Sequence, residues 1–169
     1  NQGHITYIRT DSTKVDPGFI PSITESITST FSKDDVDPSR RPKIVMTQKA
    51  SKGNSDQQGH ECIRVTNMEL PFDAIDNTLQ RKVYVWIWKR TMASMMKSQN
   101  YDTYTIQINA KGMKEHHFIG AVDDVTYDGY MKVYNQYDNL GNSITSKNTK
   151  NPLVSLMKKL LDFEKKIKV

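Results

Sequence analysis

The chain has 169 residues and a mass of 19.4 kDa, with 36% hydrophobic and 25% charged residues, which fits one ordinary domain or two small ones. This composition argues against a coiled coil, a collagen or a long disordered chain. The single Cys62 cannot form an internal disulfide, which excludes a secreted disulfide scaffold and favours a reducing compartment. The formal net charge is +5, but 17 basic and 17 acidic residues balance over 1–146, so the excess lies in the Lys-rich last 23 residues.

No apolar run approaches the ~18 residues that a membrane-spanning helix needs, and no signal-peptide pattern opens the chain. We therefore expect an intracellular protein without a membrane partner. The chain starts at Asn1, and a strand-like stretch follows within a few residues, which suggests a piece of a longer polypeptide. The Lys-rich tail and the basic stretch 38–52 could each follow a phosphate backbone or form ordinary solvated surface.

The apolar spacing predicts two helices in the first two thirds of the chain. The first covers about 17–32, or begins at Pro21 as its first residue, because proline is tolerated only in the opening turn. The long segment 32–59 is expected to be a connection that includes an acidic cluster at Asp34, Asp35 and Asp37. The second helix is expected between Asp73 and Lys97, with one apolar face made of Ile75, Leu79, Val83, Trp86, Ile87, Ala93 and Met96.

The spacing then changes to the alternation of a strand. Tyr104, Ile106 and Ile108 predict a half-buried strand, and 118–125 predicts a second strand after a turn at Lys111-Gly112. Asp128-Gly129 predicts another turn, with a third strand over 130–134. The tail 152–169 fits an amphipathic helix, although its last five residues fit a short strand equally well.

The sequence contains no Gly-rich phosphate loop, no Cys/His spacing typical of a zinc site and no recognisable order of Ser, His and Asp as in a catalytic triad. Tyr7 and Arg9 would share a face of an extended segment, where a guanidinium stabilises a phenolate and binds a phosphate. On spacing alone, a buried tyrosine beside a surface arginine is the more ordinary interpretation. Trp86 and Trp88 could stack on bases, but the apolar pattern places Trp86 in the core.

Three sequence blocks, in order, carry a family resemblance. "GHITYIRTDS" (Gly3–Ser12) resembles the catalytic-tyrosine motif of type IA DNA topoisomerases, G-x-I-T-Y-x-R-T-D-S. "GHECIRVTN" (Gly59–Asn67) is similar to the family's H-E-A-I-R-P-T segment, with Cys62 and Val65 as departures. "QRKVYVWIWKRTMASMM" (Gln80–Met96) is similar to the family helix Q-x-x-L-Y-x-x-I-W-x-R-x-x-A-S-x-M. The strands after residue 100 look like the start of the family's gate-arch domain.

The resemblance implies an enzyme that cleaves one DNA strand through a transient 5'-phosphotyrosine and relaxes supercoils by strand passage. By this similarity Tyr7 is the nucleophile, and Arg9 stabilises the phenolate and the scissile phosphate. His60 would bind a neighbouring phosphate or nucleotide, with Asp11 as its hydrogen-bond partner. Arg64 would be either a DNA-backbone contact or half of a structural ion pair. Thr10 and Ser12 are expected to be turn or capping hydroxyls.

The family's magnesium ligands lie in a separate Toprim domain that precedes this region, and no matching acidic motif occurs in these 169 residues. We therefore expect Mg²⁺ to be bound outside this chain, which by itself should not relax DNA. The expected partners are single-stranded DNA and the remaining domains of the same polypeptide, and the expected location is with DNA in the cytoplasm or nucleus.

The expected fold class is α+β. A mainly helical domain (1–98), similar to CAP-like helix-turn-helix folds and containing a small sheet, carries the tyrosine. Antiparallel strands of a partial arch domain and the Lys-rich tail follow in 99–169. The alternative function is a non-catalytic module that binds single-stranded nucleic acid. A third class, a structural or protein-interaction domain, has only the Lys-rich tail in its favour.

Overall fold

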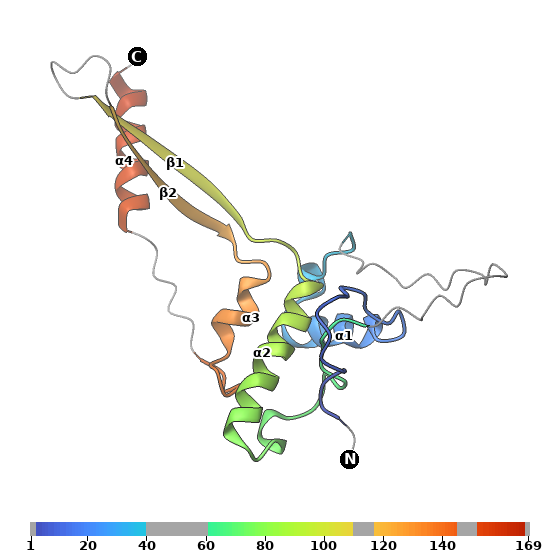
Figure 1. Ribbon diagram of the computed structural model, residues 1–169. Helices are drawn as coiled ribbons and strands as arrows, with labels where there is room; N and C mark the ends of the chain where they lie inside the picture. The colour runs from blue at the N-terminus through green and yellow to red at the C-terminus, as the bar shows by residue number, and fades with distance from the viewer. Residues whose placement is uncertain (1–2, 40–60, 110–116, 145–151, 168–169) are drawn as a thin grey trace. The chain divides into compact units, whose positions relative to one another are not determined.

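A computed structural model describes residues 3–39, 61–109, 117–144 and 152–167 (Figure 1). The chain divides into two compact units, of which the first comprises 1–98 and 129–145 and the second comprises 99–128 and 146–169. Helices dominate the first unit and an antiparallel two-stranded sheet lies in the second, which confirms the predicted α+β class. The helices of the first unit are α1 (Ile20–Thr30), α2 (Thr78–Ser94), α3 (Met131–Gln136) and the short 3₁₀ turns Lys33–Asp35 and Phe72–Ala74.

Helix α1 confirms the first predicted helix, and Pro21 lies in its opening turn, where its missing N–H removes no helical hydrogen bond. Ile23 and Ile27 are fully buried on one face of this helix. Helix α2 begins at an Asn77 cap, whose side-chain oxygen accepts from the backbone N–H groups of Leu79 and Gln80 at 3.0 and 3.1 Å. Both predicted helices therefore form with ordinary local signals.

The buried face of α2 differs in part from the predicted face: Ile75, Ala93 and Met96 are buried as predicted, but the middle of the helix is not oriented as expected. Tyr84, Trp88 and Met92, spaced four residues apart, point into the core, whereas Leu79, Val83 and Trp86 are 72%, 56% and 53% exposed. The placement of Trp86 in the core is therefore wrong. The true stripe contains a tyrosine and a tryptophan whose polar ends are satisfied internally: Tyr84 Oη donates to Asn67 O and Trp88 Nε1 donates to Met68 O.

Residues 129–136 correct the prediction of a third strand, because Met131–Gln136 is the helix α3. Gly129 has φ +53°, and a Cβ there would lie 2.4 Å from Ser98 O, so this turn requires glycine. The chain then turns sharply, and the N–H of Tyr130 donates to Lys97 O at 2.9 Å. Val133 of α3 is fully buried in the core.

The predicted acidic cluster is also different in structure. Asp35 is only 1% exposed, and its carboxylate accepts from Lys132 Nζ of α3 at 2.6 Å. Ser32 caps the 3₁₀ turn around it by accepting from Asp34 N at 3.2 Å. Asp35 is thus a structural ion-pair partner and not part of a solvated acidic loop.

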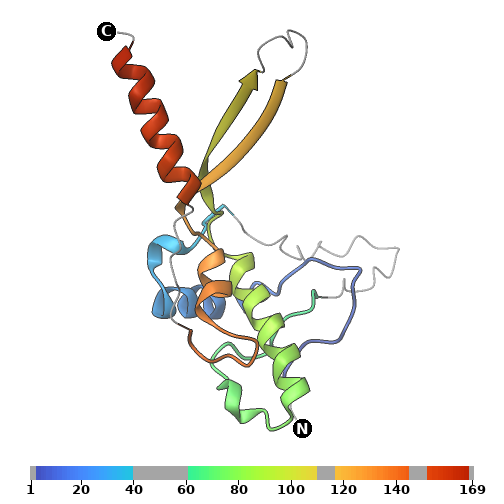
Figure 2. The same cartoon turned by 90° about the vertical axis from the view of Figure 1, so that its left-hand side faces the viewer.

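In the second unit, β1 (Asn100–Asn109) pairs antiparallel with β2 (His117–Tyr127), which confirms the two predicted strands (Figure 2). The predicted Lys111-Gly112 turn lies outside the described residues. Helix α4 (Pro152–Ile167) contacts β2, and Lys158 Nζ donates to Asp124 at 2.5 Å. The tail is therefore helical as far as Ile167, and the alternative of a terminal strand is wrong over that range. No helix in the described part of the chain is long and apolar enough to span a membrane.

Candidate active site

The segment before Tyr7 is fixed by backbone pairing with residues that lie some sixty positions later. Ile5 and Val65 form an isolated antiparallel bridge. The N–H of Thr6 donates to Arg64 O at 2.9 Å, and the N–H of Thr66 donates to His4 O at 3.1 Å. Two of the blocks that resemble the topoisomerase motifs therefore lie side by side.

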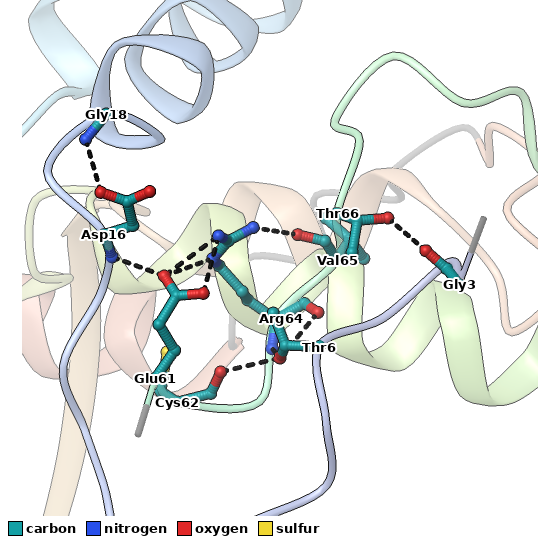
Figure 3. A network of polar contacts seen from close by, with 9 residues as sticks. All are labelled: Gly3, Thr6, Asp16, Gly18, Glu61, Cys62, Arg64, Val65 and Thr66. Atoms are coloured by element: carbon teal, nitrogen blue, oxygen red, sulfur yellow. Dashed lines mark hydrogen bonds and ion pairs between the residues drawn. The ribbon is translucent and has the colours of Figure 1, made fainter. Parts of the chain in front are cut away.

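Two threonine side chains reinforce this pairing (Figure 3). Thr6 Oγ1 donates to Cys62 O at 2.8 Å and accepts from the N–H of Arg64 at 3.0 Å. Thr66 Oγ1 donates to Gly3 O at 2.7 Å. Because Thr6 directly precedes Tyr7, these hydrogen bonds fix the backbone from which the Tyr7 side chain extends.

From Tyr7 onward the chain is exposed. Tyr7 is 82% exposed and Ile8 is 68% exposed, so the ordinary interpretation of a buried tyrosine beside a surface arginine is wrong. The side chain of Arg9 is 45% exposed, and its guanidinium lies 4.0 Å from the Asp11 carboxylate, itself 63% exposed. An exposed ion pair at this distance is weak, so the guanidinium keeps donors for an incoming phosphate.

Arg64 has a different environment. It is 8% exposed, and its Nη2 donates to both carboxylate oxygens of Glu61 at 3.0 and 2.9 Å, while Nη1 donates to Val65 O at 2.9 Å. Its guanidinium carbon also lies 3.8 Å from the centre of the Phe19 ring. Of the two roles expected for Arg64, the structure contains the ion pair, and a DNA contact by this residue stays a prediction.

Glu61 links this ion pair to the start of α1. Its Oε1 accepts from the N–H of Asp16 at 2.7 Å, and Asp16 Oδ1 accepts from the N–H of Gly18 at 3.0 Å (Figure 3). Next to it, burial raises the pKa of the Cys62 thiol, as does the neighbouring Glu61 carboxylate, which disfavours a reactive thiolate. Glu61 and Cys62 are therefore structural residues behind the exposed tyrosine segment.

A groove of about 370 Å³ lies between the segment after Tyr7 and the C-terminal half of α2. Its lining residues are Ser12, Thr13, Val15, Cys62, Ile63, Arg64, Arg90, Thr91 and Ser94. Ser12 Oγ accepts from the N–H of Lys14 at 3.2 Å, which confirms its predicted role in a turn. Arg90 is exposed and brings a second cation to this side of the unit.

Comparison with known proteins decides the family. The DNA topoisomerase family model matches residues 1–162. The chain belongs to the DNA topoisomerase family.

Over the matched region, this chain is about one third identical to topoisomerase relatives. It is 33% identical over 140 residues to the mimivirus (Acanthamoeba polyphaga mimivirus) protein "DNA topoisomerase 1 type prokaryotic", covering 78% of this chain and 16% of that protein. It is 36% identical over 146 residues to DNA topoisomerase 1 of Thermotoga maritima, covering 82% and 22%. The solved full-length topoisomerase I of Thermotoga maritima matches with a TM-score of 0.60 and 26% identity, over 88% of this chain and 22% of that chain. The chain thus spans about a fifth of the length of these relatives.

Two predictions about this topoisomerase segment concern His60 and a metal ion. His60 lies outside the described residues, so its expected pairing with Asp11 stays a prediction. Within the described ranges, no three His, Cys, Asp or Glu side chains are grouped to hold a metal ion. Arg90 is not among the predicted site residues, because no spacing rule shows which side of α2 meets the segment after Tyr7.

Proposed function

We propose that this chain is the tyrosine-bearing part of a type IA DNA topoisomerase, in which Tyr7 cleaves and rejoins one DNA strand. The observation that carries the proposal is the contrast at a single peptide bond. Thr6 is held by hydrogen bonds with Cys62 O, Arg64 O and Arg64 N, and Tyr7 beside it is 82% exposed. A nucleophile that attacks a macromolecular substrate needs a side chain that is accessible and a backbone that is held in place.

The proposed reaction is an in-line displacement at phosphorus. The phenol oxygen of Tyr7 loses its proton and forms a bond to the phosphorus, while the bond from phosphorus to the 3'-oxygen breaks. The leaving 3'-oxygen takes up a proton, which gives a 3'-hydroxyl end and a 5'-phosphotyrosine. The same hydroxyl reverses the displacement after another strand has passed.

Arg9 would supply positive charge to this step. Its half-exposed guanidinium has only the weak Asp11 contact at 4.0 Å, and a guanidinium pairs with two phosphate oxygens at once. Such a pair becomes stronger as negative charge builds on the phosphoryl group, which lowers the barrier. We propose that His60 binds a neighbouring phosphate, with Asp11 as its hydrogen-bond partner. We also propose that Arg64 helps to hold the Tyr7 segment in position.

Magnesium, which the family resemblance implies, does not fit the described residues, because no three of their His, Cys, Asp or Glu side chains are grouped so that they could hold it. We propose that the ion and its Toprim domain belong to the rest of the polypeptide, and that residues 1–169 alone do not relax DNA. Within this chain we propose a catalytic role for 1–98 and the beginning of the β-rich arch for 99–169, of which residues 129–145 pack with the first unit. The proposed substrate places the protein with DNA inside the cell.

The test is a cleavage assay with the full polypeptide that carries these residues. A single-stranded oligonucleotide labelled at its 3' end is incubated with the protein and magnesium, and the reaction is stopped with SDS. We expect a labelled protein–DNA adduct that disappears in Tyr7→Phe. The matched control is Tyr101→Phe, which changes an exposed tyrosine of the second unit and should leave the adduct in place.

A wild-type protein that binds the oligonucleotide but gives no adduct would instead favour the non-catalytic binding module. A protein that neither binds nor cleaves would favour the structural class. Relaxation of supercoiled plasmid by residues 1–169 alone would overturn the proposed division of labour between this chain and the rest of the polypeptide.

A further inference from the structure

One side of α2 remains exposed and carries a tryptophan between two cations. Lys82, Trp86 and Arg90 follow one another at intervals of four residues, so they lie along one face of the helix. All three are exposed, and Trp86 is 53% exposed. A large aromatic ring on the surface of a helix needs an explanation, since its burial in the core would stabilise the fold by a few kcal/mol.

The charge on α2 is of one sign. The helix contains Arg81, Lys82, Lys89 and Arg90 and no aspartate or glutamate. Lys89 Nζ lies 5.8 Å from the centre of the Trp86 ring and donates to Tyr137 O at 2.6 Å. Asp138 acts electrostatically on Lys89, but its carboxylate also accepts hydrogen bonds from its own turn at Leu140 and Asn142. A positive helix with an exposed ring suits a polyanion that carries flat bases.

The position of Arg90 connects this face with the proposed cleavage segment. Arg90 lines the groove of about 370 Å³ together with Ser12 and Thr13, which follow the Tyr7 motif. Trp86 lies one helical turn from Arg90, and Lys82 lies one turn farther. A strand whose phosphate reached Arg90 in the groove could therefore continue along α2 over the indole ring.

We propose that Lys82, Trp86 and Arg90 form a second contact for single-stranded DNA, in which Trp86 stacks on a base and the two cations bind the flanking phosphates. This inference rests on the proposed function, because it extends the path of the strand that Tyr7 would cleave. Stacking on an aromatic ring is tolerant of sequence, so the contact should hold the strand without selecting a base.

A protein partner is the competing occupant of this face. The neighbouring groove of about 430 Å³ is lined by His4, Ile5, Ile75, Leu79, Gln80, Val83 and Tyr84, and includes neither lysine nor arginine. That groove suits an apolar protein segment and is not part of the proposal. Leu79, which is 72% exposed, therefore provides a control position on the same helix.

The experiment measures binding of residues 1–169 to a fluorescein-labelled oligo(dT) by anisotropy at low salt. Trp86→Ala should weaken binding about tenfold or more, because loss of one stacked base has an effect of that size. Lys82→Gln should reduce the slope of log affinity against log salt by about 0.7, the value for one phosphate contact on a single strand. Leu79→Ala should bind like the wild type, and circular dichroism confirms that each variant is folded.

Tryptophan fluorescence gives a second readout. Trp88 is 5% exposed, so quenching of fluorescence by unlabelled oligo(dT) should report on Trp86. Trp86→Phe keeps an aromatic ring, and we expect it to bind within about threefold of the wild type but to lose the quenching.

Equal affinities for the wild type and Trp86→Ala would overturn this inference and leave the cleavage by Tyr7 untouched. A loss of affinity in Leu79→Ala as large as that in Trp86→Ala would also overturn it, in favour of a general apolar surface. If the wild type did not bind oligo(dT) at all, the second contact would fail. The adduct assay with the full polypeptide would then decide separately whether the proposed function fails as well.

Discussion

Arg9 and Arg64 carry the same guanidinium within one unit of the molecule, but their surroundings are opposite. Arg64 is 8% exposed, and its donors are bonded to Glu61 and to Val65 O. The Arg9 side chain is 45% exposed, and its contact with Asp11 is 4.0 Å long. A buried cation has to bond to protein groups because water is absent, whereas an exposed one stays available to a ligand.

The same contrast divides the segments that carry the two arginines. Residues 61–66 hold the base of the tyrosine segment through backbone and threonine hydrogen bonds, and residues 7–11 extend into solvent. Residues 61–66 therefore fix the position of the tyrosine segment, and residues 7–11 remain accessible from solvent. Substitutions in the two segments should accordingly affect different measurements.

After Tyr7→Phe, which should abolish the adduct, the largest effect is expected from Arg9→Gln. It removes the cation that we place at the scissile phosphate, so the rate of adduct formation should fall about 10²–10³-fold. The midpoint of thermal unfolding should stay within experimental error, because the Arg9–Asp11 pair is exposed and long. A variant that cleaves normally, or that loses stability, would break the comparison with Arg64.

Glu61→Gln should show the reverse pattern. It leaves the buried Arg64 without its anionic partner and weakens the contact with Asp16 N, so the free energy of unfolding should fall by about 2–3 kcal/mol. Denaturant titration of residues 1–169 measures this change. Glu69→Gln, at an exposed glutamate three residues before the 3₁₀ turn Phe72–Ala74, should change the free energy of unfolding by less than about 0.5 kcal/mol. Equal effects of the two variants would mean that the ion pair contributes little.

Thr6→Val tests the hydrogen bonds that hold the tyrosine segment, with a smaller expected loss of stability. Valine keeps the shape of threonine but removes a donor to Cys62 O and an acceptor for Arg64 N, which should reduce the free energy of unfolding by about 1–2 kcal/mol. The matched variant is Thr10→Val, which alters an exposed threonine of the same segment and should leave stability unchanged. Chemical denaturation of both variants beside the wild type makes the measurement.

The smallest effect is expected from Tyr84→Phe in the core of the first unit. Burial raises the pKa of Tyr84 from its ordinary value of 10 to about 12. Between these values the unfolded chain loses the phenol proton that the folded chain keeps, so this contribution to stability falls as the pH rises. Urea unfolding at pH 9, 10 and 11 should therefore show the wild type losing stability relative to Tyr84→Phe above pH 10. A constant difference between the two proteins would contradict the raised pKa.

Local sequence signals predicted much of this fold. Pro21 marks the opening turn of α1, and the alternation of Tyr104 and Ile106 marks β1. The third predicted strand failed because alternating apolar residues over 130–134 fit either structure. What decides for α3 is non-local: Gly129 turns tightly against Ser98, and Lys132 reaches the buried Asp35.

The face of α2 could not be read from hydrophobicity alone. Lys89 looks like a surface residue, yet it is 3% exposed because its ammonium bonds to Tyr137 O, and burial lowers its pKa. Tyr84 and Trp88 enter the core because backbone carbonyls of a distant segment accept from their polar ends. Tertiary contacts bring these hydrogen-bond partners to the helix, and the spacing of apolar residues along the helix cannot predict them.

For the site, the motif around Tyr7 predicted the exposed residues but not what supports them. The two expected roles of Arg64 were equally open in the sequence, and only its pairing with Glu61 distinguishes them in the structure. The groove that joins Ser12 to Arg90 was not predictable, because it depends on how α2 packs against a segment about eighty residues earlier.

The most direct test of the central claim is to identify the tyrosine in the adduct. The full polypeptide is trapped on single-stranded DNA with SDS, digested with nuclease and protease, and the nucleotide-bearing peptide is sequenced by mass spectrometry. The chain contains eight tyrosines. We predict a single modified peptide with the 5'-phosphate of the nucleotide attached to Tyr7. Modification of another tyrosine, or attachment through a 3'-phosphate, would contradict the account.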